Sequence, residues 1–500
     1  MNMHGVSRFT IVGIIIAIIV VATAVGILLT TTQTTTTLTT APTTSTTLTT
    51  TPTTTEQLPN EILIGVAIQL SGSLSVEGTA SLFGMRIMEK WINDHGGVYL
   101  KGKHIPIKLI YYDCESKRDY AVQLTEKLIT SDKVNIVIHP YASSFVMATA
   151  PVTEKYHMFS INFGGSSDTI HEQGFKYLVS THTFASQYWK TPLELIKSAD
   201  PNVKRVAIIY GDDEWGRSLA VAARKWVNEF GLEMVYDKAY PTTITDATPL
   251  LREIAPLKPD ILFVGSHYAD MYLIATQMRD LRVYIKWVVG QVGVSKPEFG
   301  ANLGKWAVGF IGETTWEPEV KWEIVAKKEG KEYYGPTSDE FVKYYYEMGG
   351  KGRPSAYLGY GGVAVLLAAK VIEEAQSLDP DKLREAAGRL DFYWLKSRFK
   401  IDETGKQIGS INPVVQWQWH NGNLTYEIVY PYDFATAKVI PMPTWEEKEK
   451  WTQTAAISFT PLLNDAVINS NLVIGPMFMT SNLELISVVQ FKIKNNFFIF

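Results

Sequence analysis

The chain has 500 residues, of which 46% are hydrophobic and 20% are charged, so it can bury a large core and form more than one domain. Its formal net charge is −4 and its Lys and Arg residues form no block, which argues against a nucleic-acid partner and against an anionic membrane surface. The single cysteine, Cys114, excludes an intrachain disulfide and a lipid anchor attached directly after an apolar leader.

The first predicted element is the apolar run at residues 11–29, which is long enough to span a membrane once. Arg8 precedes the run and places its N-terminal side in the cytoplasm. The small residues Ala22, Thr23 and Ala24 fit instead the cleavage site of a removable signal peptide. We therefore expect residues 1–29 to be an anchor or a signal peptide. The body would then be held at the extracellular face of the membrane or secreted.

Residues 30–55 consist mostly of threonine, interrupted by Pro42 and Pro52. Such a tract has no apolar face to bury, so it is expected to stay extended and solvated. Thr/Pro-rich stalks are typical acceptors of O-glycans, although a bare flexible linker explains the composition equally well. In both interpretations the tract is a stalk between the leader and the body. A threonine stalk without a lipid-bearing cysteine also suggests an archaeal surface protein.

From residue 61 onward, β-rich apolar runs alternate with amphipathic stretches, which is typical of an α/β fold with parallel sheets covered on both faces. There are too many runs for one sheet, so two lobes are expected. The predicted strands lie at residues 62–70, 105–112, 134–139, 158–162, 206–210, 233–240, 261–264, 287–289 and 308–311. The predicted helices between them include residues 83–93, 120–130, 218–230 and 272–281.

The later part of the body, residues 338–390, is predicted to be mainly helical, with a strongly apolar helix at 363–375. Asp379 and Pro380 form a helix start, with Asp379 as the cap and Pro380 at the first helical position. Short β-like runs follow. Residues 452–500 carry few charges and are left unassigned.

Motifs of catalysis do not occur: the sequence has no G-x-S-x-G elbow, no H-E-x-x-H pair, no Walker loop and no G-x-G-x-x-G turn. The acidic triplet at residues 212–214 lies between a predicted strand and a predicted helix, where acids cap the helix start better than they bind a metal. We therefore expect no enzyme activity, no metal site and no cofactor.

Small hydroxyl residues, glycines and aromatic residues follow the predicted strands, at the edge where ligands bind in open α/β sheets. Hydroxyl groups and backbone N–H groups at helix starts form a site suited to a carboxylate. Aromatic rings opposite would cover an apolar ligand body. The residues in these positions are Ser71, Gly72, Ser73, Tyr141, Ser143, Ser144, Gly164, Gly165, Ser166, Ser167, Trp215, Ser266, His267, Tyr268 and Gln291.

Several of these motifs, in this order and spacing, resemble the branched-chain amino-acid-binding family, the type I periplasmic or extracellular solute-binding proteins of ABC importers. The resemblance covers residues 61–431 and is carried by the segments 64–66, 70–73, 139–144, 204–210, 215–216, 354–357 and 391–392. It implies two Rossmann-like lobes, a Venus-flytrap arrangement, that close over one small-molecule ligand. It also implies an ABC permease as partner, and we expect a monomer.

By the same resemblance, lobe I comprises residues 61–183 and 314–392, and lobe II comprises residues 184–313 and 393–440. Hinges are expected near residues 180–183, 313–316 and 392–395. Ser143 or Ser144, the Gly165 backbone and the Ser166 hydroxyl should hold a ligand carboxylate. The remaining expected ligand-binding residues are Ser73, Leu74, Trp215, His267 and Gln291.

The sequence departs from the family where amino-acid-binding members place acids for the ligand ammonium group. Gln291 and approximately Ala185 occupy those positions here. Because a buried ammonium group needs a compensating charge or several acceptors, an amide, a urea-like compound, a carboxylate or a peptide is nearly as plausible a ligand as an amino acid. Two other functions stay open: the ligand-sensing domain of a receptor, and a surface hydrolase. The missing nucleophile motifs disfavour the hydrolase.

Overall fold

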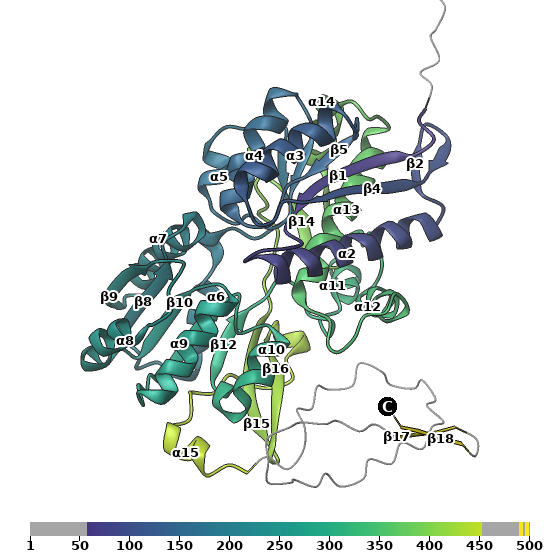
Figure 1. The fold of residues 1–500 in the computed structure, drawn as a ribbon. Helices are drawn as coiled ribbons and strands as arrows, with labels where there is room; N and C mark the ends of the chain where they lie inside the picture. Colours follow the sequence, from purple (N-terminus) through teal and green to yellow (C-terminus); the bar gives the residue numbers. More distant parts are fainter. Residues whose placement is uncertain (1–57, 453–489, 494–495, 500) are drawn as a thin grey trace, which may run out of the picture. The chain divides into compact units, whose positions relative to one another are not determined.

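A computed structural model describes residues 58–452 and two short strands, β17 (Gln490–Ile493) and β18 (Asn496–Ile499) (Figure 1). The expected leader (1–29) and stalk (30–55), and almost all of the 452–500 segment, lie outside the described residues. The membrane anchor and the signal-peptide alternative therefore stay predictions.

The first sheet has five parallel strands in the order β4-β1-β5-β6-β7. Its strands are β1 (Ile62–Ile68), β4 (Ile107–Asp113), β5 (Ile136–Ile138), β6 (Ser160–Asn162) and β7 (Leu178–Ser180). Leu128 and Ile129 of helix α3 (Arg118–Thr130) pack on Ala67 and Val137 of this sheet. Because helices cover a parallel sheet on both faces, its strands are nearly continuous apolar runs, as predicted. The chain before β7 also contains α2 (Ser75–Asp94), β2 (Val98–Leu100), β3 (Lys103–Ile105), α4 (Ser143–Lys155) and α5 (Thr169–Glu172).

Helix α13 (Ala356–Ala375) returns to this first lobe and packs along helix α2 (Ser75–Asp94). Glycines allow the two helices to approach closely: a Cβ atom on Gly84 would lie 1.9 Å from the Leu358 carbonyl oxygen, and one on Gly361 would lie 1.9 Å from that of Ser81. Within the described residues, α13 is the one helix long and apolar enough to cross a membrane, but 89% of its apolar window is buried. It is the core helix of the lobe and begins earlier than the predicted 363–375.

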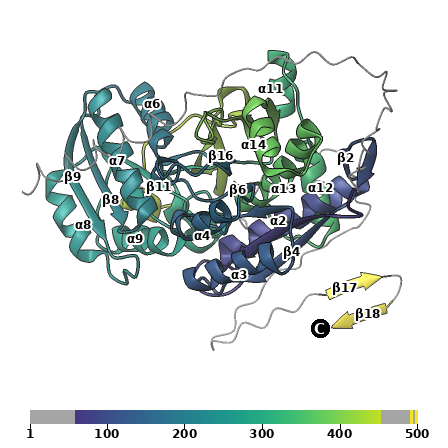
Figure 2. The ribbon, with the colours of Figure 1, turned by 90° about the horizontal axis from the view of Figure 1, so that it is seen from above.

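The second sheet has seven strands in the order β16-β15-β12-β11-β10-β8-β9, parallel except for the antiparallel β15 and β16 at one edge. Its strands are β8 (Arg205–Gly211), β9 (Glu233–Tyr240), β10 (Ile261–Gly265), β11 (Trp287–Gln291), β12 (Phe310–Glu313), β15 (Val414–His420) and β16 (Asn423–Tyr430). The helices that accompany it are α6 (Lys190–Ala199), α7 (Glu214–Glu229), α8 (Thr248–Ile254), α9 (Tyr268–Asp280), α10 (Pro297–Leu303) and α15 (Trp445–Glu449). The sheet and these helices form the second lobe (Figures 1 and 2).

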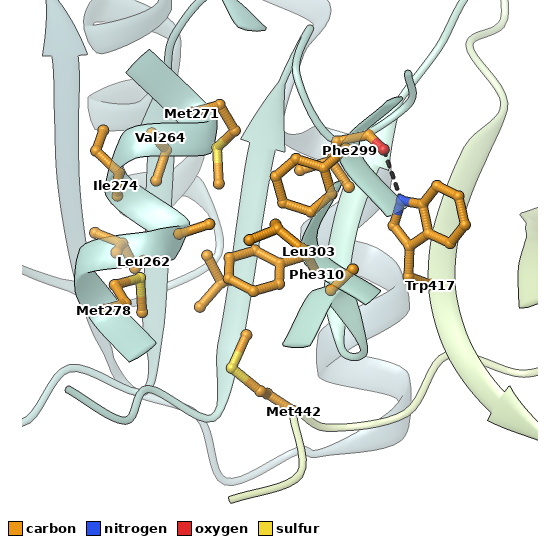
Figure 3. Close-up of a cluster of buried hydrophobic side chains, with 14 of the residues drawn as sticks. Leu262, Val264, Met271, Ile274, Met278, Phe299, Leu303, Phe310, Trp417 and Met442 are labelled. Carbon is orange, nitrogen blue, oxygen red and sulfur yellow. Dashed lines mark hydrogen bonds between the residues drawn. The ribbon is translucent and has the colours of Figure 1, made fainter. Parts of the chain in front are cut away.

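Figure 3 shows how the late strand β15 is fixed in the core of the second lobe. Trp417 lies against the cluster that holds Phe299 and Phe310, and its ring Nε1 donates a hydrogen bond of 2.9 Å to the Val294 carbonyl. The lobe is therefore completed by a segment about 100 residues after its first five strands.

The chain passes between the two sheets three times: after β7, after β12 and between the hairpin β13–β14 and β15. Between the second and third passages lie α11 (Trp322–Glu329), α12 (Ser338–Glu347), α13, α14 (Pro380–Arg389), β13 (Asp391–Trp394) and β14 (Ser397–Lys400). Helix α14 confirms its predicted start, because the Asp379 side chain accepts a hydrogen bond from the Lys382 N–H. The α/β fold with two parallel-sheet lobes is thus confirmed, while the predicted lobe boundaries and hinges stay predictions.

Candidate ligand-binding site

A small cavity of about 30 Å³ lies between the two lobes. Aromatic and hydroxyl side chains dominate its wall. They come from several segments of each lobe. The lining residues are Tyr141, Ala142, Ser143, Ser144, Gly164, Ser166, His182, Tyr188, Asp213, Trp215, His267, Val292, Tyr357 and Tyr360. The cavity therefore belongs to both lobes and would change shape if they moved apart.

The polar end of the cavity is built by two loops of the first lobe. Helix α4 begins at Ser143, directly after β5 and its loop, so its positive end lies at the cavity. The Ser143 hydroxyl oxygen accepts hydrogen bonds from the Ser166 N–H (3.1 Å) and the Ser167 N–H (3.0 Å). Ser143 thus fixes the loop that carries Ser166 and Ser167. Ser144 and Ser166 line the cavity beside it. Hydroxyls at a helix start suit an anionic ligand group.

Gly165 takes part in this polar end indirectly. Its N–H donates to the Asn162 side-chain oxygen at 2.7 Å, and the Asn162 amide donates back to the Gly165 carbonyl at 2.7 Å. The neighbouring Gly164, rather than Gly165, lines the cavity. The Gly165 backbone therefore shapes the loop that carries Ser166.

Across the cavity, the side chains of Asp213 and His267 of the second lobe contact each other. Asp213 caps helix α7 by accepting from the Gly216 N–H, as predicted, and its second oxygen lies 3.4 Å from Nε2 of His267. Burial disfavours the charge on both groups. The mutual hydrogen bond and attraction outweigh it, so the pKa of Asp213 is lowered and the pKa of His267 is raised.

Two ring nitrogens at the cavity have no hydrogen-bond partner within the described residues: Trp215 Nε1 and His267 Nδ1. The two rings lie side by side, with centroids 5.2 Å apart. Since a buried polar atom without a partner costs free energy, both atoms are available to a ligand: Trp215 Nε1 as a donor, and His267 Nδ1 as a donor when the ring is protonated and as an acceptor when it is neutral with its proton on Nε2. They are the strongest local indication that a polar molecule belongs here.

Tyrosines cover the middle of the cavity. The ring of Tyr141 meets Tyr357 edge-on at 5.6 Å, and Tyr357 lies 4.9 Å from Tyr360. Burial raises the pKa of all three hydroxyls, so they stay neutral and serve as hydrogen-bond donors and acceptors. Aromatic faces of this kind suit the apolar or aromatic body of a small ligand.

The structure brings together five of the predicted site residues: Ser143, Ser144, Ser166, Trp215 and His267. Ser73 and Leu74 lie further out, in a larger solvent-open part of the cleft that also includes Ser144, Asp213 and His267. Gln291 is buried at the end of β11, where its amide donates to the Glu313 carboxylate instead of lining the cavity. Its neighbour Val292 lines the cavity in its place.

Although Gln291 and Ala185 stand where relatives carry acids, the second lobe brings one acidic residue, Asp213, into the cavity wall. Sequence reasoning assigned Asp213 to helix capping alone, although its position two residues before Trp215 was a usable signal. Tyr188, Tyr360 and His182 were missed entirely. They come from a buried turn, the core helix α13 and the first passage between lobes, which no local pattern marks as a site.

Comparison with known proteins agrees with this geometry. A family model described as periplasmic binding protein matches residues 61–423. Leu/Ile/Val-binding protein homolog 7 of Brucella abortus is 24% identical over 397 residues, which are 77% of this chain and 94% of that protein.

Solved structures share the fold. The branched-chain amino acid transporter substrate-binding protein LivJ of Streptococcus pneumoniae, in complex with isoleucine, has a TM-score of 0.61 and 22% identity, covering 74% of this chain and 100% of LivJ. A solute-binding protein of an ABC transporter from R. palustris, in complex with 4-hydroxybenzoate, has a TM-score of 0.62 and 18% identity, covering 77% and 98%. The chain therefore belongs to the periplasmic binding protein family, with the Leu/Ile/Val-binding proteins among its relatives.

Proposed function

We propose that this protein captures a small carboxylate-bearing solute outside the cell and delivers it to the permease of an ABC importer. The observation that carries the proposal is the cavity between the lobes, with hydroxyls at the start of α4 on one side and the rings of Trp215 and His267 on the other. The protein acts by binding and has no catalytic role. The relatives that match most of the chain are named as binding proteins.

The chemistry of the wall limits the ligand to two classes. A carboxylate fits Ser144 and Ser166, and the tyrosine faces fit an apolar or aromatic body. Asp213 is the acid in the cavity wall; an ammonium group would share it with His267 and the α7 cap, so an amino acid stays a candidate beside an aromatic acid with a hydroxyl group. The relatives above were solved with one ligand of each class, isoleucine and 4-hydroxybenzoate.

Closure of the lobes is the working step of the proposed mechanism. In this structure the lobes meet on both sides of the cavity, through Lys296 and Glu77 (2.6 Å) and through Ser167 and Ser218 (2.6 Å). A ligand shifts the balance between open and closed forms only by binding the closed form better. The closed, monomeric form then docks on the permease, and residues 1–29 tether the protein at the extracellular face of the membrane.

A thermal-shift screen of residues 56–451 tests the proposed function. The panel contains branched-chain amino acids, hydroxybenzoates, their amides, short peptides and sugars. A ligand at 100 times its Kd adds about 2.7 kcal/mol of stability, which gives a clear increase in Tm. Stabilisation by isoleucine or 4-hydroxybenzoate is the expected result. A response to sugars alone, or to nothing, would contradict the proposal.

Trp215→Ala is expected to weaken binding of the screened ligand by about 1–3 kcal/mol, or roughly 5- to 150-fold in Kd, because a large buried contact and an N–H donor are lost. Isothermal titration calorimetry measures the change. Trp226→Ala is the control: Trp226 lies on the same helix α7, and its Nε1 donates to the Ser186 carbonyl instead of meeting the cavity. Equal affinities for wild type and Trp215→Ala would remove Trp215 from the site.

A further inference from the structure

Lys396 is a fully buried amine at the turn between β13 and β14, with 1% of its surface exposed. Its Nζ lies 3.4 Å from Nδ1 of His182 and 3.5 Å from the Thr181 carbonyl oxygen, and it stands 4.5 Å from the centre of the Tyr360 ring. Among residues 58–452, no carboxylate lies within ion-pair distance of it. A buried charge without a partner is costly, so this amine needs an explanation.

The neighbours of Lys396 connect it to the cavity. His182 and Tyr360 both line the cavity, and Nε2 of His182 lies 3.3 Å from the hydroxyl of Tyr188, which also lines it. When the Lys396 amine donates to Nδ1, the ring proton of His182 stays on Nε2 and is directed to Tyr188. A polar chain thus runs from Lys396 through His182 to the cavity wall.

We infer that Lys396 makes the cavity selective for anionic ligands: a bound carboxylate supplies the counter-charge that the protein omits, and the amine takes up a proton from solvent as the anion enters. Lys396 is a positioning residue that acts through His182 and Tyr360. The inference rests on the proposed function, because it presupposes that a small solute binds in this cavity.

The protonation equilibria agree with this arrangement. Burial lowers the pKa of Lys396 to about 7, and burial together with the nearby Lys396 holds the pKa of His182 well below its ordinary value. Around the cavity, Asp213 is ionised and the pKa of His267 is raised, while burial raises the pKa of Glu313 to about 7. Two titratable groups face Lys396 from the elements packed around it, namely His182 and Tyr360.

The pH dependence of carboxylate affinity follows from the protonation of Lys396. A bound anion raises the pKa of Lys396 above its ligand-free value, so binding takes up a proton at pH values above 7 and takes up none well below it. Affinity for a carboxylate should therefore fall as pH rises from 7 to 9, by up to about tenfold per unit. Affinity for the matching amide should stay nearly constant over the same range.

Lys448 offers a matched control for this amine. It is also buried, and burial lowers its pKa to about 7, but its Nζ donates to the carbonyls of Val308 (2.6 Å) and Trp306 (3.2 Å) in the second lobe. It does not line the cavity and contacts no residue that does. Lys448→Met thus removes a similar buried amine without touching the proposed chain.

The test is calorimetry on the full chain with 4-hydroxybenzoate, 4-hydroxybenzamide and isoleucine as probes, at pH 6 and pH 8, in buffers of different ionisation enthalpy. Wild type should take up protons with the carboxylate at pH 8. Lys396→Met should lose about tenfold in carboxylate affinity, lose most of the proton uptake and keep its affinity for the amide. Proton uptake by His267 or Glu313 would remain in Lys396→Met. Lys448→Met should behave as wild type.

Two results would overturn the inference in distinguishable ways. If Lys396→Met binds the carboxylate as wild type does, with equal proton uptake, Lys396 has no role and the proposed function stands. If wild type binds no probe, the proposed function fails and this inference fails with it. Should Lys396→Met not fold, NMR titration of wild type with ¹³C-labelled lysine decides. A lysine signal that titrates with a midpoint near pH 7 in the free protein, and at a higher pH when the carboxylate is bound, supports the inference. If no lysine signal behaves in this way, the inference is contradicted.

Discussion

Lys296→Met is expected to open the cleft of the ligand-free protein. Lys296, which precedes α10 in the second lobe, forms an ion pair of 2.6 Å with Glu77 of α2, and both side chains are about 95% buried. The lysine also stands over the rings of Tyr357 (4.8 Å) and Tyr268 (5.3 Å). Removing one partner of a buried ion pair costs about 3–5 kcal/mol, because the other charge is left unpaired.

This cost should appear as opening rather than unfolding, since separation of the lobes returns Glu77 to water. Small-angle X-ray scattering should show a larger radius of gyration, and ligand affinity should fall. The double variant Glu77→Gln with Lys296→Met should recover part of the closed population. Lys90→Met is the control. Lys90 lies on α2, the helix of Glu77, and its pair with Asp94 is exposed and worth at most about 1 kcal/mol. An unchanged radius of gyration in Lys296→Met would refute this role.

Arg353→Met is expected to lower the free energy of unfolding by about 3–5 kcal/mol, again because buried charges lose their partner. The Arg353 guanidinium donates to Glu319 (2.6 Å) and Glu317 (2.7 Å), and it stacks 4.7 Å over the Tyr426 ring. The Tyr426 hydroxyl donates to Glu317 at 2.8 Å. The cluster therefore joins the segment after β12, the loop before α13 and strand β16.

Urea unfolding of wild type and Arg353→Met at pH 5 and pH 8 measures this loss. Even with Arg353 present, burial raises the pKa of Glu317 to about 6. Without the arginine, the folded protein binds protons more tightly than the unfolded chain, so the loss should be smaller at pH 5 than at pH 8. Arg389→Met, which removes an exposed arginine paired with Glu374 and Glu385, should change stability little. A loss independent of pH would mean that packing, not charge, dominates.

The sequence was sufficient to predict the fold, and it placed hydroxyl residues where the structure has the wall of the cavity. Continuous apolar strands, capped helices and hydroxyls after strand ends are local signals, and Ser143, Ser144 and Ser166 follow from them. Trp215 and His267 were placed by resemblance and do line the cavity.

The remaining wall could not be predicted because it depends on long-range packing. Tyr360 lies in a helix that reads as pure core. Lys396 lies behind this wall, beside His182 and Tyr360, and looks like a surface lysine in a turn until the first passage between lobes covers it. Gln291 lies outside the cavity wall. Its strand-end position suggested the cavity, but the Glu313 carboxylate on the neighbouring strand draws its amide away.

The contact between α2 and α13 at Gly84 and Gly361 also orders events during synthesis. The first lobe cannot close its core until residues 356–375 have left the ribosome, about 260 residues after α2. By then, the first five strands of the second sheet are already made. A nascent chain thus carries an unfinished first lobe, with the face of α2 uncovered, for more than half of its translation. That exposed face is a surface for chaperones to bind.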